Sequence, residues 1–119
     1  VPAVNLISDA ELNDWLATTD AELTYIGKHP QKRNALETTV VYCSHRSHDL
    51  CGGPCTVYTG GATCLSTPGT NCLRATHNVA FCDHGGCKGS CNVLDSCGTK
   101  LQDNFCYTPG TNSILVGSA

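Results

Sequence analysis

All ten cysteines of this 119-residue chain lie between positions 43 and 106, and the flanking segments contain none. An even number of cysteines at this density in a short chain is typical of disulfides, which persist outside the reducing cytosol. We therefore expect a secreted, extracellular protein with every cysteine oxidised, although the spacing does not select one pairing. The ten are Cys43, Cys51, Cys55, Cys64, Cys72, Cys82, Cys87, Cys91, Cys97 and Cys106.

A length of 119 residues predicts one domain with a modest core that disulfides must supplement. The chain contains no methionine and begins Val1-Pro2, which we interpret as a processed mature form. No apolar run is long enough to cross a bilayer, so we expect no membrane insertion.

The first 27 residues predict two short helices. Ser8 and Glu11 have the order of a capping box, and a similar order recurs over Thr19–Glu22, with Gly27 as a helix stop. Apolar residues follow each cap at helical spacing, which predicts one buried face on each helix. These apolar residues are Leu12, Trp15, Leu16, Leu23 and Ile26.

From residue 37 onward the pattern changes to β-strands. Thr38–Cys43 is rich in β-branched residues, and its alternation places Thr39, Val41 and Cys43 on one face. Further short candidates follow, separated by turns that contain glycine and proline, with no crossover helices between them. They are Thr56–Tyr58, Ala62–Leu65, Asn71–Arg74, Asn78–Cys82, Asn104–Tyr107 and Ser113–Val116.

The predicted fold class is therefore α+β. Residues 1–119 form a single domain in which a helical segment, residues 1–27, supplies two short N-terminal helices. These helices pack on a disulfide-braced antiparallel β-sheet, residues 37–116, in a helix/sheet sandwich. The strands are expected to follow one another as a meander.

The cysteine-rich region repeats itself. Cys51–Val57 and Cys87–Val93 share the form Cys-x3-Cys-x-Val, and Thr-Pro-Gly-Thr-Asn occurs at Thr67–Asn71 and again at Thr108–Asn112. Proline followed by glycine predicts a type II turn at the centre of each pentapeptide. We interpret the sheet as being built from two related halves.

Charge is distributed unevenly along the chain. The first 27 residues contain five acidic side chains and no lysine or arginine, whereas residues 28–119 contain seven lysines and arginines against five acidic residues. We interpret this asymmetry as a source of solubility and of favourable interaction with helix dipoles.

The densest polar cluster is Ser44–Asp49, which lies between Cys43 and Cys51. A polar loop tethered by disulfides is a preorganised binding surface, because little entropy remains to be lost on binding. The two cysteines and the two histidines between them have a spacing that zinc can use, but disulfide sulfur is not a thiolate ligand. We therefore expect no metal and no cofactor.

Three other interpretations of this cluster stay open. His45, paired in space with His77 or His84, has the chemistry of a general acid and base acting on a phosphodiester. Alternatively, the cluster hydrogen-bonds the hydroxyls or carboxylates of a sugar, with Tyr42 or Tyr58 offering an apolar face. The third interpretation is a solvated loop without a function.

The chain also contains the stretches Leu6–Leu12 with Trp15-Leu16, Tyr42-Cys43-Ser44, Cys51–Tyr58 and Asn104–Asn112. Together they resemble the small secreted glycan-binding and immunomodulatory proteins of mushrooms, over nearly the whole chain. The resemblance implies a lectin-like, non-enzymatic protein with a helix-and-sheet sandwich fold. It also implies a dimer joined through an extended antiparallel sheet and a positively charged glycan-binding region.

We therefore expect a secreted fungal lectin that binds glycans on cell-surface or viral glycoproteins, with a defence or immunomodulatory role and no enzymatic activity. A homodimer would strengthen weak single-site binding by avidity. No nucleic-acid partner is expected, because basic and aromatic residues do not interleave. The candidate glycan-binding residues are His45, Arg46, His48, Asp49 and Tyr58, with Lys32 and Arg33 as secondary candidates.

The alternatives are a secreted ribonuclease-like enzyme, a membrane-active toxin and a purely structural secreted protein. Low aromatic content and the absence of a basic amphipathic helix argue against the toxin. Histidine involvement in glycan binding predicts an affinity that changes between about pH 5 and 8.

Overall fold

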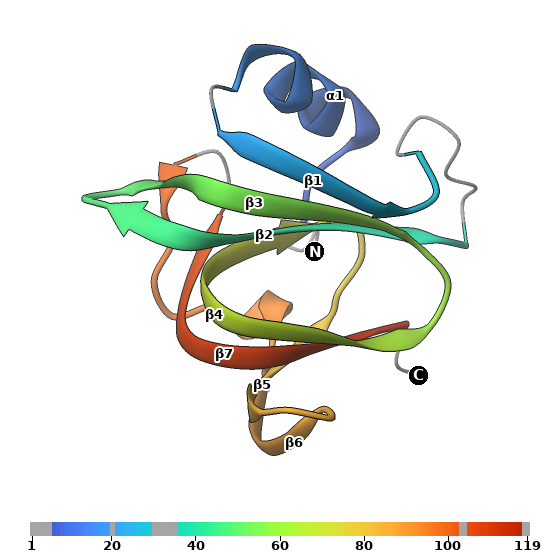
Figure 1. Cartoon of the computed structure of the whole chain (residues 1–119), viewed down its shortest axis with the longest axis vertical. Helices are drawn as coiled ribbons and strands as arrows, with labels where there is room; N and C mark the ends of the chain where they lie inside the picture. The colour runs from blue at the N-terminus through green and yellow to red at the C-terminus, as the bar shows by residue number, and fades with distance from the viewer. Residues whose placement is uncertain (1–5, 20, 30–35, 103–104, 118–119) are drawn as a thin grey trace.

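The computed structural model describes residues 6–19, 21–29, 36–102 and 105–117 (Figure 1). These residues form one α-helix, seven strands and the 3-10 helix η2. In chain order the elements are α1 (Asp9–Thr18), β1 (Glu22–Gly27), β2 (Thr38–Ser47), β3 (Leu50–Gly60), β4 (Thr63–Ala75), β5 (Ala80–His84), β6 (Lys88–Val93), η2 (Leu94–Ser96) and β7 (Cys106–Val116).

The seven strands form one mixed sheet in the order β1-β3-β2-β4-β7-β5-β6. Neighbouring strands are antiparallel except for β1, which runs parallel to β3. The sheet is curved, with α1 beside β1 at one end and the β5–β6 hairpin at the other (Figure 1). The protein is therefore mostly β, and the predicted α+β class with two helices on an antiparallel meander is wrong.

The first predicted helix is confirmed as α1. Glu11 N donates to Ser8 Oγ at 3.1 Å, and Ser8 N donates to Glu11 Oε1 at 3.5 Å, which completes the capping box. Leu12 is buried, and Trp15 and Leu16 pack beside it. No helix within the described residues is long and apolar enough to span a membrane.

The second predicted helix is instead the edge strand β1. Thr19 Oγ1 accepts a hydrogen bond from Ala21 N at 3.1 Å, which makes a local turn where a helix cap was expected. Glu22–Gly27 contains threonine, tyrosine and isoleucine, which favour extended structure, and its pairing covers the edge of β3. Leu23 packs into the core as predicted, but Ile26 is 37% exposed.

Apolar side chains are buried on both faces of the sheet. Val41 and Cys43 belong to the core under α1, as the predicted alternation requires. Val40, Leu73 and Ile114 belong to a second core on the opposite face. Because Val40 and Val41 are neighbours in β2 and both are fully buried, this central strand is covered on both sides.

A buried arginine sits in the core under α1. Arg74 on β4 is only 2% exposed, and its guanidinium carbon lies 4.9 Å from the ring centroid of Trp15 and 4.6 Å from that of Phe105. The two rings meet edge to face with centroids 5.5 Å apart. A planar guanidinium stacks favourably on aromatic rings, so this cluster fixes α1 to the sheet.

All ten cysteines form disulfides, which confirms that the protein is disulfide-rich. Two of the bonds connect adjacent strands, β2 to β3 and β5 to β6. The five bonds are Cys43–Cys55, Cys51–Cys72, Cys64–Cys87, Cys82–Cys91 and Cys97–Cys106.

Two related halves make up the sheet. Strands β2, β3 and β4 form the first half and β5, β6 and β7 the second, and the order β3-β2-β4-β7-β5-β6 is symmetric about the β4–β7 pair. The two Thr-Pro-Gly-Thr-Asn pentapeptides lie inside β4 and β7, so the prediction that they separate two strands is wrong. Gly69 and Gly110 both have a φ of 77°, and the pairing register shifts beside them, as in β-bulges.

Replacing Trp15 with alanine should lower the free energy of unfolding by about 3 kcal/mol, because it removes the stacking partner of Arg74 and Phe105. Guanidinium denaturation of the oxidised protein measures the change. Leu36→Ala, at a side chain 94% exposed, is the control and should change stability by less than about 0.5 kcal/mol. Equal effects of the two variants would contradict a structural role for this cluster.

Candidate functional site

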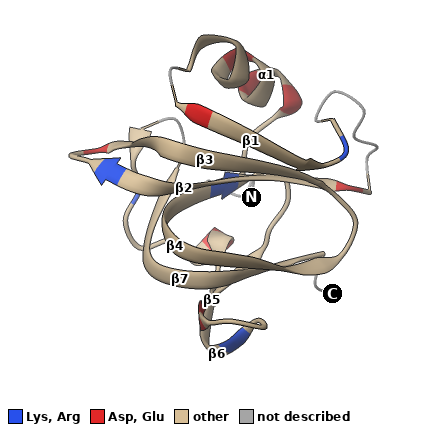
Figure 2. Cartoon of the chain, in the orientation of Figure 1, with Lys and Arg blue, Asp and Glu red and all other residues tan. Residues whose placement is uncertain are grey.

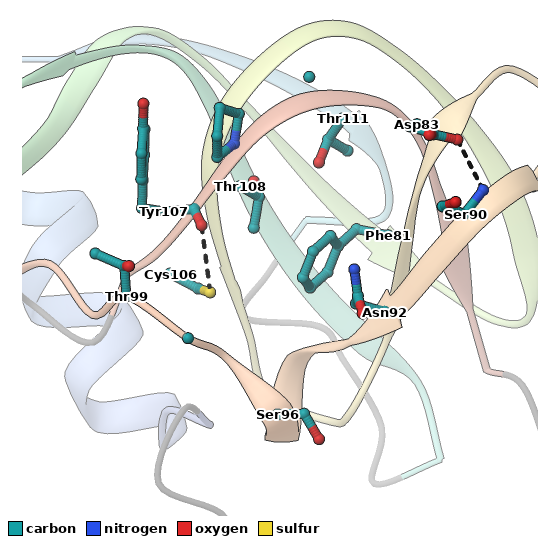
Figure 3. A pocket seen from close by; sticks show the side chains of 13 residues that line it. Phe81, Asp83, Ser90, Asn92, Ser96, Thr99, Cys106, Tyr107, Thr108 and Thr111 are labelled. Atoms are coloured by element: carbon teal, nitrogen blue, oxygen red, sulfur yellow. Dashed lines mark hydrogen bonds between the residues drawn. The ribbon is translucent and has the colours of Figure 1, made fainter.

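A pocket of about 580 Å³ lies on the second half, where β5, β6 and β7 meet the segment Ser96–Thr99 (Figure 3). We call it the Phe81 pocket. The lining side chains that matter for its chemistry are Phe81, Asp83, Ser90, Asn92, Thr108 and Thr111.

Strand alternation brings the β5 and β6 residues of this pocket together. Phe81 pairs with Asn92, and Cys82 pairs with Cys91, so successive residues point to opposite faces of the hairpin. The Cys82–Cys91 disulfide links the two strands next to this pair. Phe81 and Asn92 therefore lie side by side on the face that lines the pocket (Figure 3).

The opposite wall comes from the chain between η2 and β7. The Cys97–Cys106 disulfide ties this segment to the start of β7, and Tyr107 N donates to Thr99 O at 2.9 Å. The bulge at Pro109-Gly110 follows directly, where β7 bends. A disulfide and a backbone hydrogen bond thus hold this wall in place, so the pocket is preformed.

Thr108, next to Tyr107 in β7, contains an unusual buried polar group. The residue is 2% exposed, and its Oγ1 has no hydrogen-bond partner among the described residues. A buried hydroxyl without a partner costs about 1–3 kcal/mol, so most proteins avoid one. Thr70, at the equivalent bulge of β4, has a buried hydroxyl that is hydrogen-bonded, because its Oγ1 donates to Thr67 O at 2.8 Å.

Asp83 supplies a carboxylate at the rim. Its Oδ1 accepts hydrogen bonds from His84 Nδ1 at 2.7 Å and from Ser90 N at 2.8 Å. The bond from His84, and then the bond from Ser90, hold the pKa of Asp83 below its ordinary value of 3.8. The side chain is 48% exposed, so the carboxylate is charged and open to solvent at neutral pH.

The chemistry of the Phe81 pocket suits a neutral, hydroxyl-rich molecule. No lysine, arginine or histidine is among the described residues that line it, so this lining does not suit phosphate or sulfate groups. Its hydroxyls, the amide of Asn92 and the carboxylate of Asp83 can donate to or accept from ligand hydroxyls. The ring of Phe81 adds an apolar surface (Figure 3).

Four of the residues predicted from the sequence cluster at the end of the β2–β3 hairpin. His45, Arg46, His48 and Asp49 are all exposed there. The Arg46 guanidinium lies 4.4 Å from the ring centroid of Tyr107, which packs against the core under α1, whereas Phe81 packs against the second core. Asp49 is also bonded to Gln102, whose Nε2 donates to Asp49 Oδ2 at 3.0 Å.

The other predicted residues do not join this cluster. Tyr58 lies at the far end of β3, opposite Val40, and its hydroxyl donates to Gly61 O at 2.8 Å. Burial, and then the charge of Glu37, raise the pKa of Tyr58. Lys32 and Arg33 lie outside the described residues.

The basic residues expected to form one region are dispersed in the part of the chain that is described (Figure 2). Arg46 lies at the hairpin end, Arg74 is buried under α1, and Lys28 forms an ion pair of 2.7 Å with Glu37. Acidic side chains lie on α1 and at the start of β1.

The geometry also bears on the metal and nuclease interpretations. Cys43 and Cys51 are both in disulfides, and the described residues contain no group of three or more potential metal ligands. The nuclease interpretation pairs His45 with His77 or His84. His77 Nδ1 instead lies 3.2 Å from Thr76 Oγ1, and His84 Nδ1 lies 2.7 Å from Asp83 Oδ1.

Sequence reasoning did not identify Phe81, Asn92 or Thr108. The signal was present in the repeat, because Tyr42-Cys43-Ser44-His45 and Phe81-Cys82-Asp83-His84 share an aromatic-Cys-x-His pattern upstream of each Cys-x3-Cys. The pattern alone does not show that the second copy borders a pocket, since that depends on the wall formed by residues 96–99.

Comparison with known proteins finds no matching family model, no similar curated protein and no similar solved structure.

Thr108→Val should stabilise the protein by about 1 kcal/mol, because it removes a buried hydroxyl without a partner and keeps the side-chain shape. Thr70→Val should destabilise it by a similar amount, because that hydroxyl donates a hydrogen bond. Thermal unfolding of both variants measures the two changes. A destabilised Thr108→Val protein would show that Oγ1 has a partner in the folded chain.

Proposed function

We propose that this protein is a secreted lectin and that the Phe81 pocket binds a sugar ring. One observation carries the proposal: a single pocket combines the ring of Phe81 with the hydroxyl, amide and carboxylate groups of Ser90, Asn92 and Asp83.

The surrounding groups support a neutral glycan as the ligand. A sugar ring has apolar C–H faces and hydroxyls at its edge, so it needs an apolar surface surrounded by mixed donors and acceptors. Phe81 offers the first, and Asp83, Ser90 and Asn92 offer the second. One ring leaves much of a volume of about 580 Å³ unfilled, so an oligosaccharide fits better than a single sugar.

The disulfides support an extracellular location, since five of them would be reduced in the cytosol. Glycans on the surface of foreign cells or viruses are then the accessible targets, and a defence or immunomodulatory role follows. The resemblance to secreted mushroom proteins agrees with this assignment.

A homodimer joined through the sheet is part of the proposal. β1 and β6 are the two edge strands, and most of their residues are exposed. An exposed strand edge pairs readily with another strand, so either edge can extend the sheet into a second copy.

A glycan array probed with the native, unreduced protein should show selective binding to a related group of neutral oligosaccharides. Phe81→Ala and Asn92→Ala should each weaken that binding about tenfold, a loss of about 1.4 kcal/mol, by removing the apolar face and the side-chain amide. Arg46→Ala should have a smaller effect, because its guanidinium lies against Tyr107.

The variants separate the possible results of this experiment. Binding lost only in Arg46→Ala would move the site to the β2–β3 hairpin, with its histidines. Binding retained in every variant would keep a lectin but reject both locations. No binding to any glycan would contradict the proposed function and return the nuclease and toxin to consideration.

The affinity for the tightest-binding array glycan should change less than about twofold between pH 5 and 8. No histidine is among the described lining residues, and Asp83 stays ionised because its pKa is below 3.8. His84 Nδ1 donates to Asp83 both as that neutral tautomer and as imidazolium, so its protonation preserves the bond. The contribution of Asp83 is lost only as the pH falls through that lowered pKa.

Titration calorimetry at several pH values measures this dependence, with Asp83→Asn as the control that lacks the carboxylate at every pH. A marked change between pH 5 and 8 would favour the hairpin histidines as contacts, because imidazoles gain charge in that range.

A further inference from the structure

A second cavity lies at the end of α1, away from the Phe81 pocket. It is a groove made of two adjoining pockets of about 340 and 400 Å³, which share Thr19, Cys51, Gly52 and Gly53. We call it the α1 groove. Its described lining residues come from the end of α1, the start of β1 and the β2–β3 hairpin, and none of them lines the Phe81 pocket.

The groove exists because β1 covers only part of the edge of β3. Pairing between these strands begins at Glu22 and Pro54, so the start of β3, Leu50–Gly53, has no neighbour on the β1 side among the described strands. The chain leaves α1 through the turn at Thr19, whose Oγ1 accepts from Ala21 N. The β2–β3 hairpin therefore extends past the end of α1 (Figure 1).

Strand alternation brings side chains of this hairpin into the groove. Cys43 packs into the core under α1, and His45 and Ser47 follow on the same face of β2. Their partners on β3 are Gly52 and Leu50, which also line the groove. His45, Ser47 and Leu50 are exposed, so a ligand can reach the groove from solvent.

Both walls of the groove are held in place. The Cys51–Cys72 disulfide ties the start of β3 to β4. Gln102 N donates to Asp49 O at 2.8 Å and Gln102 Nε2 donates to Asp49 Oδ2 at 3.0 Å, which fixes the hairpin end. On the other side, the aromatic cluster under α1 fixes Trp15. The α1 groove is therefore formed before a ligand arrives.

The lining of the groove suits a sugar ring. Trp15, which is partly exposed, and Leu50, which is 51% exposed, offer apolar surface. The hydroxyl of Ser47 and the imidazole of His45 can exchange hydrogen bonds with ligand hydroxyls. Trp15 is also the only tryptophan of the chain, so its fluorescence reports on this groove.

The electrostatics of the groove favour a ligand with a positive charge. The carboxylate of Glu22 lines it, and no lysine or arginine is among the described lining residues. α1 has no basic residue in its last turn, so no side chain of the helix offsets the negative end of its dipole at Thr18 and Thr19. Arg46, on the same hairpin, lies against Tyr107 instead.

We infer that the α1 groove is a second carbohydrate site and that it binds sugars with a free amino group, such as chains of glucosamine. This inference rests on the proposed function, because it extends carbohydrate binding to another cavity. The sugar ring contacts Trp15 and Leu50, and its ammonium group interacts with Glu22 and the carbonyl groups at the end of α1. An N-acetylated sugar has the same ring without this charge, so it binds more weakly.

Two sites with different preferences change which surfaces the protein binds tightly. The Phe81 pocket takes neutral sugars and the α1 groove takes amino sugars, and a partly deacetylated chain of N-acetylglucosamine contains both. A molecule that engages such chains at both sites gains affinity by avidity. The gain does not require a dimer.

Fluorescence titration of the oxidised protein with a glucosamine tetramer tests the inference, because Trp15 lines the groove. The emission of Trp15 should change and then saturate. The N-acetylglucosamine tetramer should bind about threefold more weakly, as expected for the loss of a partly exposed charge interaction. Glu22→Gln should weaken binding of the glucosamine tetramer by a similar factor.

Three glycine variants separate this site from the Phe81 pocket. A β-carbon added at Gly52, Gly98 or Gly61 meets no protein atom within 4 Å, so each variant should fold. Gly52→Gln fills the groove and should weaken binding detected at Trp15 about tenfold. Gly98→Gln fills the Phe81 pocket and should weaken only the binding of neutral glycans on the array. Gly61→Gln lines neither cavity and is the matched control, which should change neither result.

Several results would overturn the second site. An unchanged Trp15 emission with the glucosamine tetramer would do so. A response that survives in Gly52→Gln would do so too, because this variant keeps every charge and the response would then be non-specific attraction. Equal affinity for the two tetramers would overturn the preference for amino sugars. Each of these results leaves the proposed lectin intact if neutral glycan binding is lost in Gly98→Gln, whereas a Trp15 response without any neutral glycan binding would reject the Phe81 pocket alone.

Discussion

The pairing of β4 with β7 is the interaction through which the whole sheet is assembled. Within the sheet the two halves are hydrogen-bonded through these two strands, because β2 and β3 lie outside β4, and β5 and β6 lie outside β7. Both strands contain a proline, which removes one donor from the ladder, and a glycine with positive φ. The two strands therefore bend at the same level, and the curvature of the sheet follows from that shared bend.

Packing and covalent links then stabilise an arrangement that a chain of this size supports poorly by burial alone. Each disulfide contributes roughly 2–4 kcal/mol by restricting the unfolded chain, although bonds in overlapping loops do not add independently. α1 and β1 cover the first half only, and Arg74 between Trp15 and Phe105 holds the helix there. The second half lacks this cover and leaves β6 exposed.

The sequence predicts the features that depend on neighbouring residues. The capping box at Ser8 identifies α1, the alternation over Thr38–Cys43 identifies β2, and the repeated motifs identify two halves. It fails where tertiary pairing overrides a local pattern. Residues 19–27 have a helix-like cap and spacing, yet Glu22–Gly27 pairs with the open edge of β3 as a strand.

The candidate site shows the same division between local and long-range information. A polar cluster such as His45–Asp49 is visible in the sequence, whereas the Phe81 pocket combines residues separated along the chain and joined by the Cys97–Cys106 disulfide. The pentapeptide that contains Thr108 was visible, but its turn-like composition hid its place inside a strand. Only the pairing of β4 with β7 shows that both bulges bury a hydroxyl.

The symmetry between the halves is broken at one covalent link. In the first half Cys51 bonds to Cys72, but the equivalent of Cys72 is Ser113, which accepts a hydrogen bond from Cys87 N at 2.9 Å. Cys87 is thereby left to bond with Cys64, in the only disulfide that joins the two halves. Duplicated proteins are open to domain swapping, in which two chains exchange equivalent halves. The Cys64–Cys87 disulfide prevents this exchange, because it joins each half covalently to the other half of the same chain.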